Sequence, residues 1–189
     1  ALEVLGGPVG PRSLRERAWL HFRRGEIGPG RDALDAALSG LVPGEATAVI
    51  RLLAALERVS PQGRQMLARA AALGEQEGPA RALAVVDSAV AVVPVEERAP
   101  VRFQLAGWAV QAGDTSSARR ALAALVEEDP EAPEVPEAIL LHARLLAAEE
   151  DGRAVARELL TRLILDRPQA AVVPEARREL ARISDGGGS

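Results

Sequence analysis

Few residues in this sequence have the types and the spacing that catalysis or metal binding requires. The chain has no cysteine, which excludes disulfides, thiolate nucleophiles and thiolate metal sites. Its two histidines, His21 and His142, are far apart, and neither belongs to the His-Glu-x-x-His spacing of zinc hydrolases. No Gly-x-Ser-x-Gly segment places a nucleophilic serine on a sharp turn. We therefore predict that the chain is not an enzyme and needs neither a cofactor nor a metal.

Two further kinds of segment resemble ligand sites but have simpler interpretations. The glycine-rich stretch 25–30 lacks the Gly-Lys-Ser or Gly-Lys-Thr sequence that holds phosphate and magnesium, so we interpret it as a turn. Acidic clusters at 127–129 and 149–151 stand at the ends of predicted helices, where carboxylates slightly oppose the helix dipole. We interpret these clusters as solvated helix ends. We expect Trp19 and Trp108 to pack in the core rather than to stack on a ligand.

Three segments, 82–100, 118–136 and 156–174, share one pattern of residues and predict where helices begin and end. In each segment an alanine is followed by apolar residues at offsets 4 and 7 and by prolines at offsets 12 and 18. Offsets of 0, 4 and 7 mark one face of an α-helix. The first proline cannot continue that helix, and the second suits the first turn of a new one. Each segment therefore predicts a buried helix, a short link and the start of the next helix.

The composition of the 189-residue chain supports an all-α fold. Hydrophobic residues make up 48% and aromatic residues 2%, so the apolar content comes mostly from Ala and Leu, which are strong helix formers. The net charge of −4 argues against nucleic acid as the main partner. All 23 basic residues are arginine, which we attribute to a GC-rich bacterial genome. No apolar run is long enough to form a transmembrane segment.

The whole pattern predicts a right-handed α-solenoid of antiparallel helix pairs with about ten helices. The prolines that end the repeated helices recur at a period of 33 to 38 residues, which is typical of helical solenoids. We expect a flexible arm at 1–11, degenerate helical repeats at 12–61, well-formed repeats with a C-terminal capping helix at 62–183, and a flexible tail at 184–189. The expected helices are 12–24, 31–38, 45–58, 62–75, 79–93, 96–111, 115–128, 136–149, 153–165 and 172–183.

The best-formed unit, 99–130, has the small residues and the turn of a known repeat. Ala106 and Ala118 place small side chains on two successive helices, which lets the helices approach to about 8–10 Å. Gly113 and Asp114 supply the turn between these helices, and a proline closes the unit. In these positions the chain resembles the tetratricopeptide repeat (TPR) family, and the resemblance extends over the well-formed repeats. It implies a superhelix of stacked helix pairs.

Two points of register stay open at this level. In the last complete unit Arg144 falls where the TPR family has a small residue, and a shift by one position places Ala143 there. Near the N-terminus, helix 31–38 can pair either with 12–24 or with 45–58. We prefer the second pairing, because 45–58 keeps the offsets of 0, 4, 7 and 12. Helix 12–24 is then the second half of a preceding repeat, and the chain is an excerpt of a longer array.

The resemblance also implies a function and a set of site residues. In the TPR family the first helix of each pair lines a concave groove that binds a peptide or a partner protein. We therefore expect a non-enzymatic scaffold for protein–protein interaction. Family members that clamp a C-terminal carboxylate use Lys and Asn, which this chain lacks, and Arg64 and Arg102 would replace them only in part. The implied groove positions are Leu67, Ala71, Arg102, Phe103, Gln104, Gly107, Val110, Gln111, His142 and Leu145.

A second resemblance concerns the subcellular location of the protein. The sequence Val-Pro-Glu-Ala, found at 135–138 and 173–176, resembles links in repeat proteins of the Gram-negative envelope, namely outer-membrane assembly lipoproteins and the periplasmic partner of the Tol-Pal system. This favours the bacterial periplasm or cell envelope over the cytoplasm. The alternative is a TPR segment of a larger regulatory or enzyme-fused polypeptide, since the sequence begins with Ala1 rather than Met.

Overall fold

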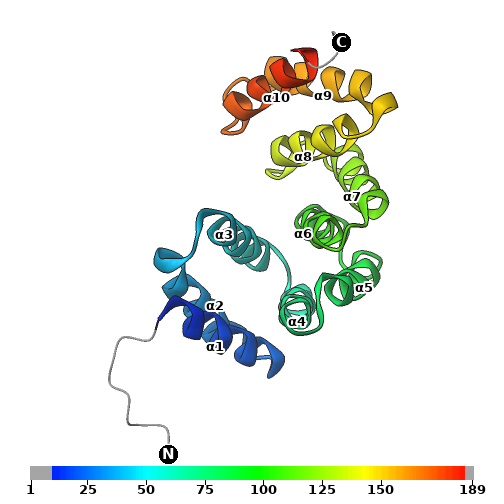
Figure 1. Cartoon of the computed structure of the whole chain (residues 1–189). Helices are drawn as coiled ribbons and strands as arrows, with labels where there is room; N and C mark the ends of the chain where they lie inside the picture. Colours follow the sequence, from blue (N-terminus) through cyan, green and yellow to red (C-terminus); the bar gives the residue numbers. More distant parts are fainter. Residues whose placement is uncertain (1–9, 186–189) are drawn as a thin grey trace, which may run out of the picture. The chain divides into compact units, whose positions relative to one another are not determined.

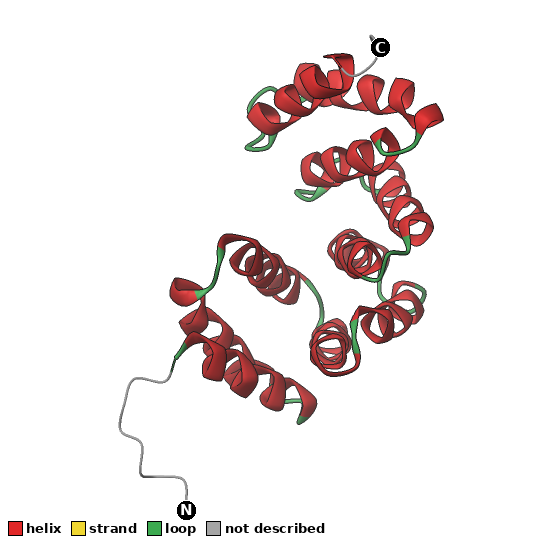
Figure 2. Cartoon of the chain, viewed as in Figure 1, coloured by secondary structure: helices red, strands yellow, loops and turns green. Residues whose placement is uncertain are grey.

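The computed structural model describes residues 10–185 and forms ten α-helices in that range (Figure 1). No strand occurs among these residues (Figure 2), so the expected all-α fold is confirmed. The helices are α1 (Pro11–Arg23), α2 (Ile27–Ala37), α3 (Pro43–Arg58), α4 (Pro61–Glu77), α5 (Pro79–Val90), α6 (Arg98–Gln111), α7 (Thr115–Glu128), α8 (Val135–Ala147), α9 (Arg153–Asp166) and α10 (Val173–Asp185). Short 3-10 helices are η1 (Leu38–Gly40), η2 (Val95–Glu97) and η3 (Glu150–Gly152). The arm and the tail that we expect at the two ends fall mostly outside the described residues.

Proline and glycine set many of the helix boundaries. α1, α3, α4, α5 and α8 each have a proline at one of their first two positions, where a missing N–H costs nothing. Pro94, Pro130 and Pro168, the prolines at offset 12 of the repeated segments, lie in links between helices. The predicted turn at 25–30 is shorter than expected, because most of that stretch belongs to α2. Only Gly25, with a φ of 75°, reverses the chain there.

The chain divides into two compact units, unit 1 (Ala1–Val93) and unit 2 (Pro94–Ser189). In both units consecutive helices pack against each other, as in a helical-repeat solenoid. None of the helices in the described part of the chain combines the length and the apolar content needed to cross a membrane.

In unit 1, α1 pairs with α2, α4 pairs with α5, and α1 also packs against α4, while α3 has smaller contacts with α4 and η1 (Figure 1). The first pair is close because Gly30 of α2 lies against the ring of Phe22, which a Cβ would approach to 2.3 Å. The preferred pairing of 31–38 with 45–58 is therefore wrong, and α3 is an extra helix between two stacked pairs. An apolar stripe shows that a helix is partly buried, but it does not identify the neighbour.

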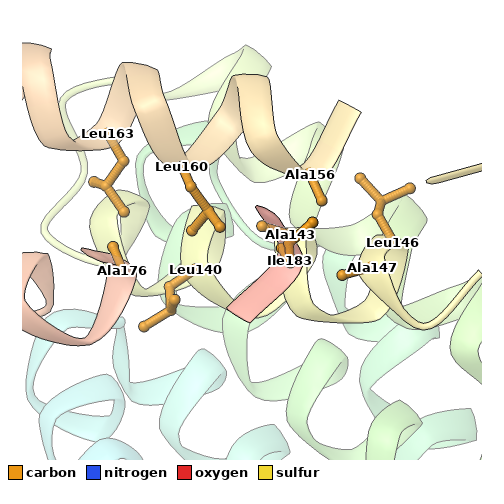
Figure 3. Close-up of a cluster of buried hydrophobic side chains, with 9 residues drawn as sticks. All are labelled: Leu140, Ala143, Leu146, Ala147, Ala156, Leu160, Leu163, Ala176 and Ile183. Atoms are coloured by element: carbon orange, nitrogen blue, oxygen red, sulfur yellow. The ribbon is translucent and has the colours of Figure 1, made fainter. Parts of the chain in front are cut away.

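In unit 2, α6 pairs with α7 and α8 pairs with α9, while α7 packs against α8 and α10 packs against α9. Ala143 is fully buried and Arg144 is half-exposed, so Ala143 is the small residue of α8. Ala106 and Ala118 are also fully buried, as close helix contacts require. Figure 3 shows the core that joins α8, α9 and α10, with Leu140, Ala143, Leu146, Ala147, Ala156, Leu160, Leu163, Ala176 and Ile183.

Candidate functional site

Three of the ten residues that we expected to face a groove lie in the core instead. Leu67 is 1% exposed, Ala71 is 4% exposed and Phe103 is 7% exposed. α4 carries the first two and packs against α1, α2, α3 and α5, so most of its circumference is covered. These three positions are therefore corrected from open surface to core. Periodicity marks one face of a helix as apolar, but the number of neighbouring helices decides how many faces are covered.

Arg102 is a second correction, because it already has a partner in unit 2. Its guanidinium binds both carboxylate oxygens of Glu128 at the end of α7, with N–O distances of 2.5 and 2.7 Å. Arg98 lies 3.8 Å from the same carboxylate. Hydrogen bonding from Arg102 lowers the pKa of the Glu128 carboxyl. Arg102 therefore joins the two helices of a pair rather than offering a free charge to a partner.

Ion pairs of this kind recur between helices, and sequence reasoning missed them. The two acidic clusters that we expected to be solvated each contain a paired member, Glu128 and Glu149. An arginine followed by a glutamate about one repeat later is the signal that identifies such pairs. The pairs and their separations in residues are Arg31–Glu57 (26), Arg102–Glu128 (26), Arg119–Glu149 (30) and Arg144–Glu175 (31).

The other predicted positions of α6 form an open surface, which we call the α6 face: Gln104, Gly107, Val110 and Gln111. Gln104, Gly107 and Gln111 follow one another along one side of the helix at intervals of three and four residues. Val110 lies beside them and is 39% exposed. A Cβ at Gly107 would meet no atom within 4 Å, so internal packing does not require a glycine there. The α6 face thus combines two amide side chains and an apolar side chain with accessible helix backbone.

A recess of about 710 Å³ opens between α7 and α8. Its lining residues follow those of the α6 face in the sequence. Arg119 of α7 donates two hydrogen bonds to Glu149, at 2.8 and 2.6 Å. Burial, followed by the charge of Arg119, lowers the pKa of the half-buried His142, so its ring is neutral at pH 7 and offers one donor and one acceptor. Leu145, one turn further along α8, is half-buried and does not line the recess. The lining residues are Gly113, Asp114, Thr115, Ser116, Arg119, Arg120, Ala123, His142 and Glu149.

The turn between α6 and α7 forms the polar edge of this recess. Gly113 adopts a φ of 75°, a conformation that favours glycine. Asp114 caps α7 by accepting a hydrogen bond from the backbone N–H of Ser117 at 2.9 Å, and hydrogen bonding with Ser117 lowers the pKa of this carboxyl. Arg120 donates to the Ser117 hydroxyl at 2.9 Å. The tight turn predicted at Gly113 and Asp114 is therefore confirmed.

The donors and acceptors of the recess and of the α6 face are suited to hydrogen-bonding a polar chain. Within residues 10–185, no group of three or more His, Asp and Glu side chains is placed to hold a metal ion. The fold and this surface define the class of the molecule as an all-α helical-repeat protein. A scan against models of known protein families gives no match to the chain. A search of curated proteins gives no match either.

Proposed function

We propose that the chain is a non-enzymatic, TPR-like scaffold for protein–protein interaction that binds a peptide or a partner protein on the α6 face. The proposal rests on the presence of a glycine, Gly107, inside helix α6. Glycine inside a helix costs roughly 0.5–1 kcal/mol relative to alanine. Internal packing does not account for that cost, because an added Cβ would contact nothing. A bound chain accounts for it, since a segment crossing α6 reaches the helix backbone most closely where a side chain is missing.

The neighbours of Gly107 have the chemistry that an extended peptide needs. The amides of Gln104 and Gln111 can each donate to a peptide carbonyl and accept from a peptide N–H. The exposed side of Val110 can contact an apolar side chain of the peptide. The recess between α7 and α8 can accept a polar side chain beside the neutral ring of His142. Backbone hydrogen bonds together with side-chain pockets are the usual basis of affinity and specificity in peptide recognition.

The test compares two substitutions at Gly107. Gly107→Trp adds a large side chain to the α6 face at a position where an added Cβ meets no atom within 4 Å, whereas Gly107→Ala adds only a methyl group. Each variant and the wild-type chain are immobilised, and proteins retained from a lysate of the source cells are quantified by mass spectrometry. We expect a smaller loss on Gly107→Ala, because its methyl group holds a bound chain slightly away from the helix backbone, and at least a tenfold loss on Gly107→Trp. Equal retention by all three proteins would contradict binding at the α6 face.

We further propose that the protein is located in the bacterial periplasm or cell envelope. The support is the Val-Pro-Glu-Ala sequence that resembles envelope repeat proteins. In this chain Val135 and Val173 both stand at the first position of a helix, α8 and α10, so the two copies occupy equivalent places in the fold. Fractionation of the source cells with an antibody against the protein tests this location, and recovery in the cytosol would contradict it.

A further inference from the structure

α2 and α3 of unit 1 do not pack along each other, and a groove of about 440 Å³ lies between them. The two helices are joined at one end by η1 and the following turn (Figure 1). At the other end Arg31 of α2 forms an ion pair with Glu57 of α3 at 2.5 Å. We call this space the α2–α3 groove. Its lining residues are Arg31, Asp32, Asp35, Leu38, Ile50, Leu53, Ala54 and Glu57.

The α3 side of the groove is a helix face that is separate from the buried face of α3. Ile50, Leu53, Ala54 and Glu57 follow the intervals of three, four and seven residues that place side chains on one side of a helix. Ile50 is 54% exposed, although isoleucine is among the residues most often buried. The core of unit 1 instead takes the other side of α3, with Val49, Leu52, Ala55 and Leu56. The groove face therefore remains apolar without contributing fully to the core.

The charged side chains around this apolar floor are mostly acidic. The groove is lined by three carboxylates and one arginine, which gives a net charge of −2. Arg31 is held by Glu57. Asp32 and Asp35 are exposed on α2 and make no ion pair in the described part of the chain. A ligand with positive charges on one side and apolar side chains on the other would complement both the acidic α2 side and the apolar floor of the groove.

We propose that the α2–α3 groove docks a basic amphipathic segment of a partner protein. The apolar side of the segment covers Ile50, Leu53 and Leu38, and its Lys or Arg side chains pair with Asp32 and Asp35. This is a helix-in-groove type of recognition, in which apolar anchors recur at helical spacing. The site lies in unit 1 and shares no residue with the α6 face, so either proposal can fail while the other stands.

The probe for this proposal is a fluorescein-labelled peptide of Leu and Arg with the two residue types on opposite sides of a helix. A length of about 14 residues spans about 20 Å as a helix. Binding to the full chain is followed by fluorescence anisotropy at two salt concentrations. The matched peptide carries Glu in place of Arg. We expect the Leu/Arg peptide to bind with an affinity that falls as salt rises, and the Leu/Glu peptide to bind at least tenfold more weakly.

Two pairs of variants locate the bound peptide. Ile50→Asp places a charge on the groove floor and should weaken binding at least tenfold, whereas Val42→Asp should change it less than twofold, because Val42 is 62% exposed outside the groove. Asp35→Arg should weaken binding at least tenfold. Asp87→Arg makes the same change in net charge on the exposed side of α5 and should have less than a twofold effect. Circular dichroism is used to verify that all four variants keep their helices.

Any one of four results would overturn the proposal. One is equal binding of the Leu/Arg and Leu/Glu peptides, and another is equal loss of affinity in both members of either variant pair. The third is a dimer in sedimentation that Ile50→Asp dissociates, because the groove would then be filled by a second copy of this chain. Absence of any peptide binding to the wild type would count equally against it.

Discussion

Packing requires glycine at position 152 but not at position 107. A Cβ at Gly152 would lie 2.1 Å from the carbonyl oxygen of Leu146, and that backbone group cannot turn aside as a flexible side chain would. At Gly107 the same atom would meet nothing within 4 Å. Alanine at these two positions should therefore change stability in opposite directions.

Gly152→Ala should lower the free energy of unfolding by about 1–3 kcal/mol, as overpacking in a close contact does. Gly107→Ala should raise it by about 0.5–1 kcal/mol, because alanine is the better helix former. Urea unfolding followed by circular dichroism measures both values. A stabilising effect at Gly152, or a destabilising one at Gly107, would show that the backbone environments differ from those described above.

Ala118 gives a second prediction at the residue scale. It is fully buried between paired helices, whereas Ala123 on the same helix is exposed. Ala118→Trp should push the helices apart, cost at least about 1–3 kcal/mol and lower the melting temperature by several degrees. Ala123→Trp is the matched control and should shift it little. Similar melting curves for wild type and Ala118→Trp would contradict the close contact at this position.

At the scale of a single element, α10 is held to the rest of unit 2 by apolar side chains and by two carboxylates near Arg144, those of Glu175 and Glu179. Ala176 and Ile183 are buried with the core of α8 and α9. Glu179 is only 8% exposed, accepts hydrogen bonds from Arg182 and lies 3.9 Å from the Nε of Arg144. Hydrogen bonding from Arg182, followed by the charges of Arg182 and Arg144, lowers the pKa of Glu179 against the opposing effect of burial.

This lowered pKa predicts how stability depends on pH. The stabilisation from the Glu179 carboxylate is present above the unfolded pKa of about 4.3 and is lost as the pH falls through the folded value. Glu179→Gln should cost about 1–2 kcal/mol at pH 7 and should reduce the loss of stability between pH 5 and pH 3. Urea unfolding at several pH values measures both effects.

Glu158→Gln is the control for this experiment. Glu158 forms an exposed ion pair with Arg162 on α9, and such pairs contribute little to stability. The control should therefore keep the wild-type pH dependence. Parallel pH curves for Glu179→Gln and the wild type would show that this carboxylate does not anchor α10.

At the scale of the whole molecule, each of the two units has its own core. Leu56 in unit 1 and Leu160 in unit 2 are both fully buried, and replacing such a leucine by alanine costs about 2–5 kcal/mol. In helical-repeat proteins stability is approximately a sum of terms between neighbours. A substitution that destabilises one unit should therefore lower the stability of that unit more than that of the other.

Hydrogen exchange tests this expectation. Leu160→Ala should accelerate amide exchange in α8, α9 and α10 by at least about tenfold more than in α1 and α2, and Leu56→Ala should show the reverse pattern. Mass spectrometry of peptic peptides gives the rates for each helix. Uniform acceleration over all helices by either substitution would show that the chain unfolds as one cooperative body.

The α6 face shows how much of a candidate site the sequence can reveal. The spacing of Gln104, Gly107 and Gln111 on one side of a helix follows from their positions in the chain, and the structure leaves that side partly open. Their role in binding a partner stays a prediction. The α2–α3 groove had no such signal, because Leu53 fits the same apolar spacing as a core residue and its half-exposed state depends on where α2 lies.

The sequence by itself determined the helices, most of their ends and the small residues Ala106 and Ala118 at their contacts. Helix propensity, prolines in first turns and glycine at Gly113 act within a few residues of the chain, so they can be read locally. Only the tertiary structure decided that α1 rather than α3 pairs with α2, that Phe103 is covered, and that Arg102 is neutralised by Glu128. The physical reason is that periodicity shows that a helix face is buried, whereas the identity of its partner depends on contacts between residues far apart in the sequence.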